Sequence, residues 1–235
     1  METKKELIKA TSKYSFKNEV QDDKVILTLG GPVAEASFFA DETINSADIA
    51  TALDDVNKDV VIRLNSPGGD VFQGIEIYNY LKNHPSNITV EVTALAASAA
   101  SIIAMAANSI VMEKGASIMV HEAATLAIGN KADIKKTLNA LETIDESIVD
   151  IYQEKTGLDR DEISQMMSEE TWFTAKDAVD KGFADDTKEK VETPKETKVE
   201  NNAEIIELRE QVANLTNKVK SFENINKKPK TKRLL

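Results

Sequence analysis

The chain has 235 residues, no cysteine and a net charge of −11 at pH 7. The length allows one medium-sized domain with an appendage, or two small domains. The absence of cysteine excludes a disulfide framework, a thiolate metal site and a cysteine nucleophile. The acidic balance argues against a general nucleic-acid surface, which needs clustered positive charge. The first residues lack the apolar stretch of a signal peptide, and the most hydrophobic stretch, Ala94 to Ala107, is too short to cross a bilayer. We therefore expect a soluble intracellular protein with no nucleic-acid or membrane partner.

Apolar periodicity predicts strands that alternate with helices over much of the chain. The predicted elements are, in chain order, a strand at 25–29, a helix at 46–56, a strand at 60–64, a helix at 71–81, a strand at 88–92, a helix at 99–107, two strands at 109–112 and 116–120, and a long amphipathic helix at 132–154. Strands that alternate with helices indicate an α/β fold with mainly parallel strands.

The composition changes at about Asp186, where we expect a domain formed by residues 1–186 to end. Residues 187–202 are rich in lysine, glutamate and threonine, which predicts a polar linker. Residues 203–225 carry apolar side chains at alternating spacings of three and four, which predicts a coiled-coil helix. The alternative is an amphipathic helix that packs back on the domain. Residues 226–235 are expected to form a basic, disordered tail.

Three short segments carry the residue types that a serine peptidase needs. Ser98 lies among alanines at a predicted strand-to-helix transition, where unpaired amides at the helix start are available to stabilise an oxyanion. Gly68 and Gly69 follow another predicted strand and can present an amide with no side chain in the way. His84 lies in a helix-ending turn before a proline and is expected to be an ordinary surface residue. His121 ends a predicted strand and is the better candidate for a base.

Each of these features has a simpler structural interpretation. Ser98 taken alone is a small residue in an alanine-rich packed helix, and the glycine pair is a turn. The ordered combination of a glycine pair, a serine and a strand-ending histidine favours nucleophilic catalysis over that interpretation. The sequence has neither a phosphate-binding glycine-rich loop with lysine nor a histidine-rich ligand set, so no metal and no other cofactor is expected.

Four ordered segments resemble the Clp protease proteolytic subunit (ClpP) family: Asn65–Gly69, Ala96–Ser98, Met119–His121 and Trp172–Asp185. The resemblance covers roughly Val25 to Asp186. It implies a ClpP/crotonase-type fold of repeated strand–strand–helix (ββα) units, here with a C-terminal helical coiled-coil extension. It also implies a ring-like homo-oligomer, in which the helix at 132–154 is the projecting handle.

By the same resemblance Ser98 is the nucleophile and His121 the base, and the backbone amides of Gly69 and Ala99 form the oxyanion hole. A crotonase-like acyl-CoA enzyme on the same architecture would use the glycine pair and the helix amides to bind a thioester enolate. Such an enzyme does not need a paired serine and histidine, so the joint presence of Ser98 and His121 counts against it.

One position departs from the family pattern. An aspartate normally precedes the motif that begins here at Trp172, and Thr171 stands in its place. We expect Glu170 to be the third catalytic residue, because a carboxylate one residue away can orient the imidazole from a shifted backbone. The alternatives are a serine–histidine dyad without an acid, a distant acid such as Asp145, or a structural interpretation in which Glu169 and Glu170 are plain exposed charges.

Three features resemble the phage-encoded, ClpP-related head maturation proteases. They are the sequence motif at residues 170–175, the segment 128–133 that leads into the handle helix, and the linker with a coiled-coil tail. This implies an ATP-independent endopeptidase that processes capsid or scaffold protein during head maturation, in the cytoplasm of the host cell or inside the assembling prohead. The alternatives are a bacterial ClpP paralogue that works with an unfoldase, and a catalytically inactive scaffold or assembly protein.

Overall fold

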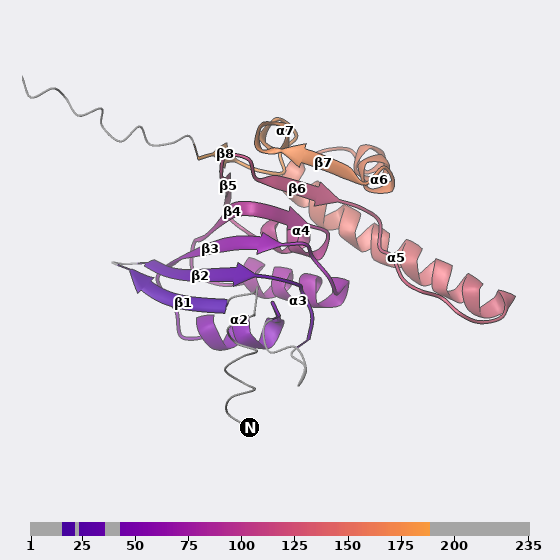
Figure 1. Ribbon diagram of the computed structural model, residues 1–235, viewed down its shortest axis with the longest axis horizontal. Helices are drawn as coiled ribbons and strands as arrows, with labels where there is room; N and C mark the ends of the chain where they lie inside the picture. Colours follow the sequence, from indigo (N-terminus) through magenta and orange to yellow (C-terminus); the bar gives the residue numbers. More distant parts are fainter. Residues whose placement is uncertain (1–15, 22–23, 36–42, 189–235) are drawn as a thin grey trace, which may run out of the picture. The chain divides into compact units, whose positions relative to one another are not determined.

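The computed structural model describes residues 16–21, 24–35 and 43–188, which form one sheet with helices packed against it (Figure 1). The main path through the sheet is β1 (Phe16–Gln21), β2 (Lys24–Gly30), β3 (Asp59–Ser66), β4 (Ile88–Ala97), β5 (Ser109–Met112) and β8 (Asp186–Thr187). Off this path, β6 (Ser117–Val120) pairs with β4, and β7 (Thr171–Thr174) pairs with β6. Only the β1–β2 and β6–β7 pairs of these described strands are antiparallel.

Strand β4 organises the functional end of the sheet because it has two neighbours along one edge. Its residues 89–92 pair with β5, and its residues 95–97 pair with β6. Along the other edge it pairs with β3, where Ser66 lies opposite Ala96. The carboxyl ends of the parallel strands β3, β4 and β6 therefore meet at one edge, which is where α/β sheets usually place their sites.

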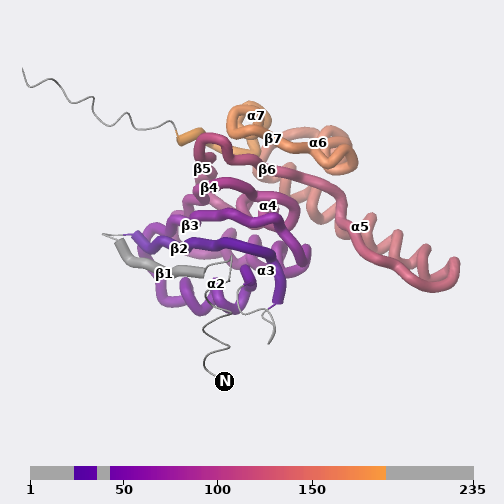
Figure 2. The backbone as a smooth tube through the Cα atoms, viewed as in Figure 1, coloured from indigo at the N-terminus to yellow at the C-terminus, as the bar shows by residue number. Residues whose placement is uncertain are grey.

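The helices of the described residues are α2 (Ser46–Leu53), α3 (Val71–Lys82), α4 (Ala99–Ala104), α5 (Lys131–Thr156), α6 (Arg160–Ser168) and α7 (Ala175–Asp180). Helix α5 begins with a capping box formed by Asn130 and Asp133 and ends at Gly157, whose φ is 73°. It extends away from the sheet, as Figure 2 shows. None of these helices is both long and apolar enough for a membrane span.

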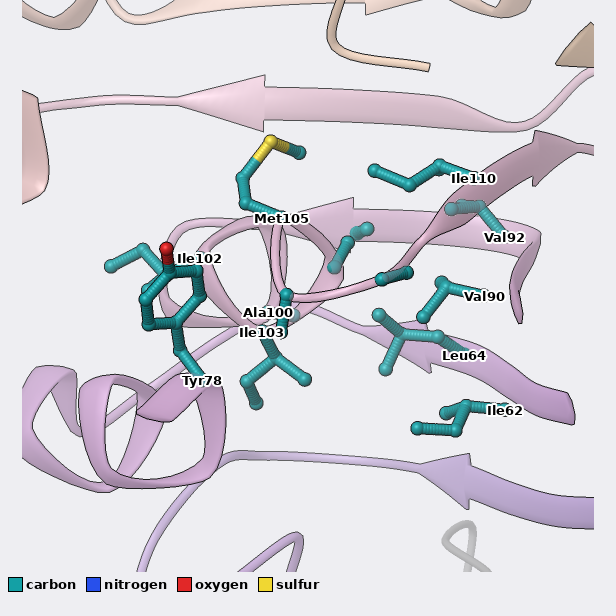
Figure 3. Packing of buried hydrophobic residues seen from close by; sticks show 14 of the residues in the cluster. Ile62, Leu64, Tyr78, Val90, Val92, Ala100, Ile102, Ile103, Met105 and Ile110 are labelled. Carbon is teal, nitrogen blue, oxygen red and sulfur yellow. The ribbon is translucent and has the colours of Figure 1, made fainter. Parts of the chain in front are cut away.

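The core lies between the sheet and helices that cover one of its faces. Alternate residues of β3 are buried, which is the pattern of a strand with one covered face, and every residue of α4 is buried. Figure 3 shows strand side chains facing those of α4: Ile62, Leu64, Val90 and Val92 on the strands, and Ala100, Ile103 and Met105 on or next to the helix. The short helix after Ser98 is thus fixed by burial on all sides.

The predicted α/β fold with mainly parallel strands is confirmed. The strand predicted at 88–92 continues to Ala97, and the helix predicted at 99–107 ends at Ala104. Both boundaries were misplaced because the whole stretch is apolar, so periodicity does not mark where the strand ends. Residue Thr187, at the start of the predicted linker, still pairs with β5. The rest of that linker from residue 189, the predicted coiled-coil helix at 203–225 and the tail lie outside the described residues.

Candidate active site

Ser98 and His121 lie side by side because they directly follow two paired parallel strands. Ala97 at the end of β4 pairs with Met119 in β6. The N–H of Ser98 donates a hydrogen bond to the carbonyl oxygen of Met119 at 2.9 Å. His121 Nε2 lies 2.7 Å from Ser98 Oγ, within hydrogen-bond distance. The structure thus brings the predicted nucleophile and the predicted base into direct contact.

The backbone of Ser98 has an unusual conformation, with φ 55° and ψ −128°. L-residues rarely adopt positive φ, and such residues often mark functional sites. Ser98 occupies the N-cap position of α4, yet its side chain makes no capping hydrogen bond to the helix amides. Its hydroxyl is therefore directed to His121 instead of to the helix, as a nucleophile needs.

The glycine pair forms a second wall of the site, against Val33. Val33 N–H donates to the Gly68 carbonyl at 2.9 Å, and Asp70 N–H donates to the Val33 carbonyl at 2.7 Å. A Cβ at Gly69, where φ is 148°, would lie 2.1 Å from the Val33 carbonyl oxygen. A Cβ at Gly68 would lie 2.5 Å from the carbonyl oxygen of Ala97. Only glycine fits at either position without a shift of the backbone.

The two amides predicted for the oxyanion hole border the same pocket as Ser98. Val33 hydrogen-bonds the carbonyl of Gly68 and the N–H of Asp70, which are the residues on either side of Gly69. In such a parallel bridge the N–H of Gly69 itself faces away from Val33. Ala99 is the first residue of α4, and its N–H has no acceptor within the helix. Gly69, Ala99, Ser98 and His121 all line one pocket.

This pocket has a volume of about 460 Å³. Aliphatic side chains from α4 and α5 form much of its wall: Ile102, Ala140, Leu141, Ile144 and Ile148. Phe72 of α3 also lines it and is 64% exposed. The acidic residues along it are Asp70 and Glu122. The pocket therefore offers an apolar interior beside a hydroxyl group, the usual composition of a binding site for an apolar group.

Glu170, predicted as the third catalytic residue, lies in the turn between α6 and β7. Its φ is 50°, and among the described residues other than glycine only Ser98 shares a positive φ. Its carboxylate accepts a hydrogen bond from Trp172 Nε1 at 3.3 Å. Within the described part of the chain, Ser98 is the only side chain that hydrogen-bonds the His121 ring. The structure thus does not pair Glu170 with His121 directly.

The two alternative acids, Asp145 and Glu169, accept hydrogen bonds from neighbouring groups other than His121. Asp145 of α5 accepts the N–H of Ala123 at 2.7 Å, two residues beyond His121, and so fixes the loop that follows the histidine. Glu169, which directly follows α6, accepts a hydrogen bond from Gln165 of that helix. Across residues 16–21, 24–35 and 43–188, no cluster of three or more histidine and acidic side chains is arranged to hold a metal ion.

His84 lies away from this site and is tied to the fold, which corrects the expectation of an ordinary surface residue. Its Nε2 lies 3.1 Å from the carbonyl oxygen of Leu53 at the end of α2. Its Nδ1 accepts the N–H of Ser86 at 3.2 Å. The turn after α3 folds the half-buried ring back against α2, so both nitrogens have structural partners.

Sequence reasoning missed two buried hydroxyl groups behind Ser98, those of Ser101 on α4 and Tyr152 on α5. Ser101 is fully buried and Tyr152 is 1% exposed. In the sequence both occupy apolar faces of predicted helices, where they look like ordinary core positions. The only available signal was a serine hydroxyl at a core position of a helix, which needs a partner when it is buried.

The chain belongs to the Clp protease family, whose sequence model, described as Clp protease, matches residues 10–191. The ATP-dependent Clp protease proteolytic subunit 1 of Chlamydia abortus is 32% identical over 130 residues, which cover 54% of this chain and 68% of that protein. Subunit 3 of Rhodococcus jostii is 28% identical over 139 residues, covering 58% and 69%. Subunit 1 of Chlamydia pneumoniae is 31% identical over 137 residues, covering 57% and 72%. The family places the chain in the serine peptidase class, whereas these bacterial relatives leave the phage subtype a prediction.

We expect Gly69→Ala to lower kcat/KM for peptide hydrolysis about 100-fold or more, because the loop must move away from Val33 and displace the amide predicted for the oxyanion hole. The matched control is Gly115→Ala, which also places a side chain at positive φ but meets no atom within 4 Å. Hydrolysis rates and melting temperatures of both variants provide the measurement. Equal activity of the two variants would contradict the assigned role of Gly69.

Proposed function

We propose that this chain is a serine endopeptidase in which Ser98 is the nucleophile and His121 the general base. The observation that carries the proposal is the 2.7 Å distance between His121 Nε2 and Ser98 Oγ. A serine hydroxyl is a weak nucleophile until an adjacent base takes its proton, and a histidine within hydrogen-bond reach meets that need. The positive φ of Ser98 and the apolar pocket beside it add support.

The reaction follows in two halves from these groups. Ser98 Oγ attacks the carbonyl carbon of the peptide while His121 Nε2 takes the hydroxyl proton. The amides of Gly69 and Ala99 stabilise the resulting oxyanion. His121 then gives the proton to the leaving amine, which departs and leaves an acyl ester on Ser98. In the second half, His121 takes a proton from water while the resulting hydroxide attacks the ester carbonyl. When the bond to Ser98 Oγ breaks, His121 returns that proton to Oγ, and the product leaves as the free acid.

Glu170 is the proposed acid that orients His121 and stabilises the imidazolium. The pairing of β6 with β7 ends where Val120 lies opposite Thr171. Because the two strands are antiparallel, the next residues at that end are His121 and Glu170. The left-handed backbone of Glu170 costs about 1–3 kcal/mol, which a plain exposed charge does not require. A rotamer change that breaks its hydrogen bond to Trp172 would free the carboxylate for the imidazole.

The pocket beside Ser98 supports a substrate with an apolar side chain next to the cleaved bond. Its α4 and α5 walls are aliphatic, and its acidic residues, Asp70 and Glu122, belong to the segments that follow β3 and β6. Burial of a charged side chain against aliphatic walls would leave the charge unpaired, which is strongly unfavourable. Peptides with leucine or methionine at this position should therefore be cut in preference to peptides with lysine or aspartate.

The relatives support the role of a bacterial ClpP paralogue better than capsid processing, because they are named as proteolytic subunits of ATP-dependent proteases. The proposed assembly is a ring-like homo-oligomer, as formed by the family, in which α5 is the handle and a separate ATP-driven unfoldase delivers the substrate. Head maturation of a phage, with capsid or scaffold protein as the substrate, is the second candidate. This candidate is supported by the sequence motif at residues 170–175 and by the predicted coiled-coil tail.

Replacement of either Ser98 or His121 by alanine should lower peptide hydrolysis at least about 1,000-fold, because each removes a group that acts in the chemical step. The double variant should be no less active than the single ones, since the two residues act as a unit. Ser147→Ala is the control, because that serine is exposed on α5 and bonds only to Thr143 within its own helix. Retained hydrolysis in Ser98→Ala would contradict the proposed function.

Glu170→Gln should reduce kcat at least about tenfold with little change in KM, because the neutral amide cannot stabilise the imidazolium. Asp145→Asn serves as the comparison, since it makes the same chemical change at the other candidate acid. Steady-state kinetics with one peptide substrate measure both variants. A full-rate Glu170→Gln enzyme together with a slow Asp145→Asn enzyme would transfer the role to Asp145, and full rates in both would indicate a serine–histidine dyad.

The two candidate biological roles differ in their need for ATP. A ClpP paralogue should degrade a folded test protein only when ATP and a Clp-type ATPase from the same organism are present, while it cuts short peptides without them. A head maturation protease should instead cut a co-expressed capsid protein at defined sites with no ATPase added. Gel analysis of both reactions separates the roles, and defined capsid cleavage without ATP would contradict the role with an unfoldase.

A further inference from the structure

Two buried hydroxyl groups form a chain of hydrogen bonds that ends on the backbone of Ser98. Ser101 Oγ lies 2.6 Å from the carbonyl oxygen of Ser98, to which it donates. Tyr152, whose phenol comes from α5, lies with its oxygen 2.8 Å from Ser101 Oγ. Neither hydroxyl contacts His121, and the proposed reaction uses neither in proton transfer.

The direction of the chain follows from its proton count. The Ser98 carbonyl oxygen can only accept, so the single hydroxyl proton of Ser101 is used there. Ser101 Oγ must then accept, and the Tyr152 hydroxyl is the donor. Burial raises the pKa of the Tyr152 phenol above its ordinary value, and the hydrogen bond to Ser101 offsets only part of that rise. The phenol therefore keeps the proton that it donates.

The Ser98 carbonyl is the group that fixes the orientation of the nucleophile. It accepts three hydrogen bonds: from the N–H of Ser101 at 2.9 Å, from the N–H of Ile102 at 3.3 Å and from the hydroxyl of Ser101. Rotation about ψ of Ser98 would break all three. A strained backbone conformation persists only where its surroundings hold it. Here the buried hydroxyl of Ser101 adds a third hydrogen bond to those of the two helix amides.

Aromatic packing fixes the other end of the chain. The Tyr152 ring contacts Phe183 edge-on, with ring centroids 5.5 Å apart. Phe183 in turn stacks on Phe173 of β7 at 4.8 Å. Phe173 and Phe183 both belong to the segment from Trp172 to Asp185 that marks the family resemblance, so this segment is linked to the nucleophile through Tyr152.

We propose that Ser101 and Tyr152 are positioning residues for the nucleophile, which hold the Ser98 carbonyl and thereby keep Oγ on His121 Nε2. The proposal rests on the proposed function, since it assigns the support of the same reacting hydroxyl. Loss of these two hydrogen bonds lets Ser98 relax toward an ordinary backbone conformation, which moves Oγ away from the imidazole. Tyr152 also lines the pocket, but phenylalanine keeps its ring there, so substrate binding is preserved while the chemical step slows.

The test compares Ser101→Ala, Tyr152→Phe and their double variant in the full-length protein, with kcat, KM and melting temperature measured for each. We expect kcat to fall about tenfold in Ser101→Ala and about threefold in Tyr152→Phe, with KM within about twofold of the wild-type value. Because Tyr152 acts through Ser101, the double variant should be no slower than Ser101→Ala alone, whereas independent effects would multiply.

Tyr78→Phe is the matched control, because it also removes a phenol that bonds a residue of α5, in this case Glu154 at 2.8 Å. It should change the melting temperature as much as Tyr152→Phe does and leave kcat unchanged. Equal kcat in wild type, Ser101→Ala and Tyr152→Phe would overturn the proposal, as would a multiplicative loss in the double variant. If the wild-type protein showed no Ser98-dependent peptide hydrolysis, the proposed function itself would be overturned.

Discussion

The positive φ of Ser98 is held by groups on three sides, and the geometry of the whole site depends on it. Its N–H bonds to Met119 in β6, its carbonyl accepts three donors from α4, and Gly68 packs against its Cβ. Such a conformation costs about 1–3 kcal/mol, whereas each of these hydrogen bonds contributes about 0.5–1.5 kcal/mol. Taken together, these bonds can offset that cost and hold the hydroxyl on His121.

The sheet explains how residues distant in sequence supply these bonds. Strand β4 is long enough to pair first with β5 and then with β6, so the chain leaves β4 between the glycine pair after β3 and the histidine after β6. The burial of every residue of α4 then anchors the helix that begins at Ala99. Strand length and helix burial thus place Ser98 beside His121, and the hydrogen bonds to the Ser98 backbone then hold its conformation.

The sequence was sufficient to predict the class of fold. The ordered combination of a glycine pair, a serine and a strand-ending histidine also pointed to Ser98 and His121, whose side chains lie 2.7 Å apart in the structure. The sequence was not sufficient to predict side-chain contacts between elements that lie far apart along the chain. The bond from Tyr152 to Ser101 joins residues 51 apart, and an amphipathic helix pattern does not say which core position meets which. The hydrogen bond from Trp172 to Glu170 depends on the left-handed backbone of Glu170, and the turn has no glycine that would have predicted this conformation. For the same reason His84 looked like a plain surface residue, although its ring closes the turn after α3 onto α2.

Activation of Ser98 by His121 can be measured by labelling with a fluorophosphonate, followed by mass spectrometry of the modified peptide. Such a reagent reacts with an activated serine and spares ordinary hydroxyls such as that of the exposed Ser147. If His121 activates Ser98, we expect one adduct, on Ser98, that is lost in His121→Ala. An adduct that persists at the same rate in His121→Ala, or no adduct in folded and assembled wild-type protein, would contradict it.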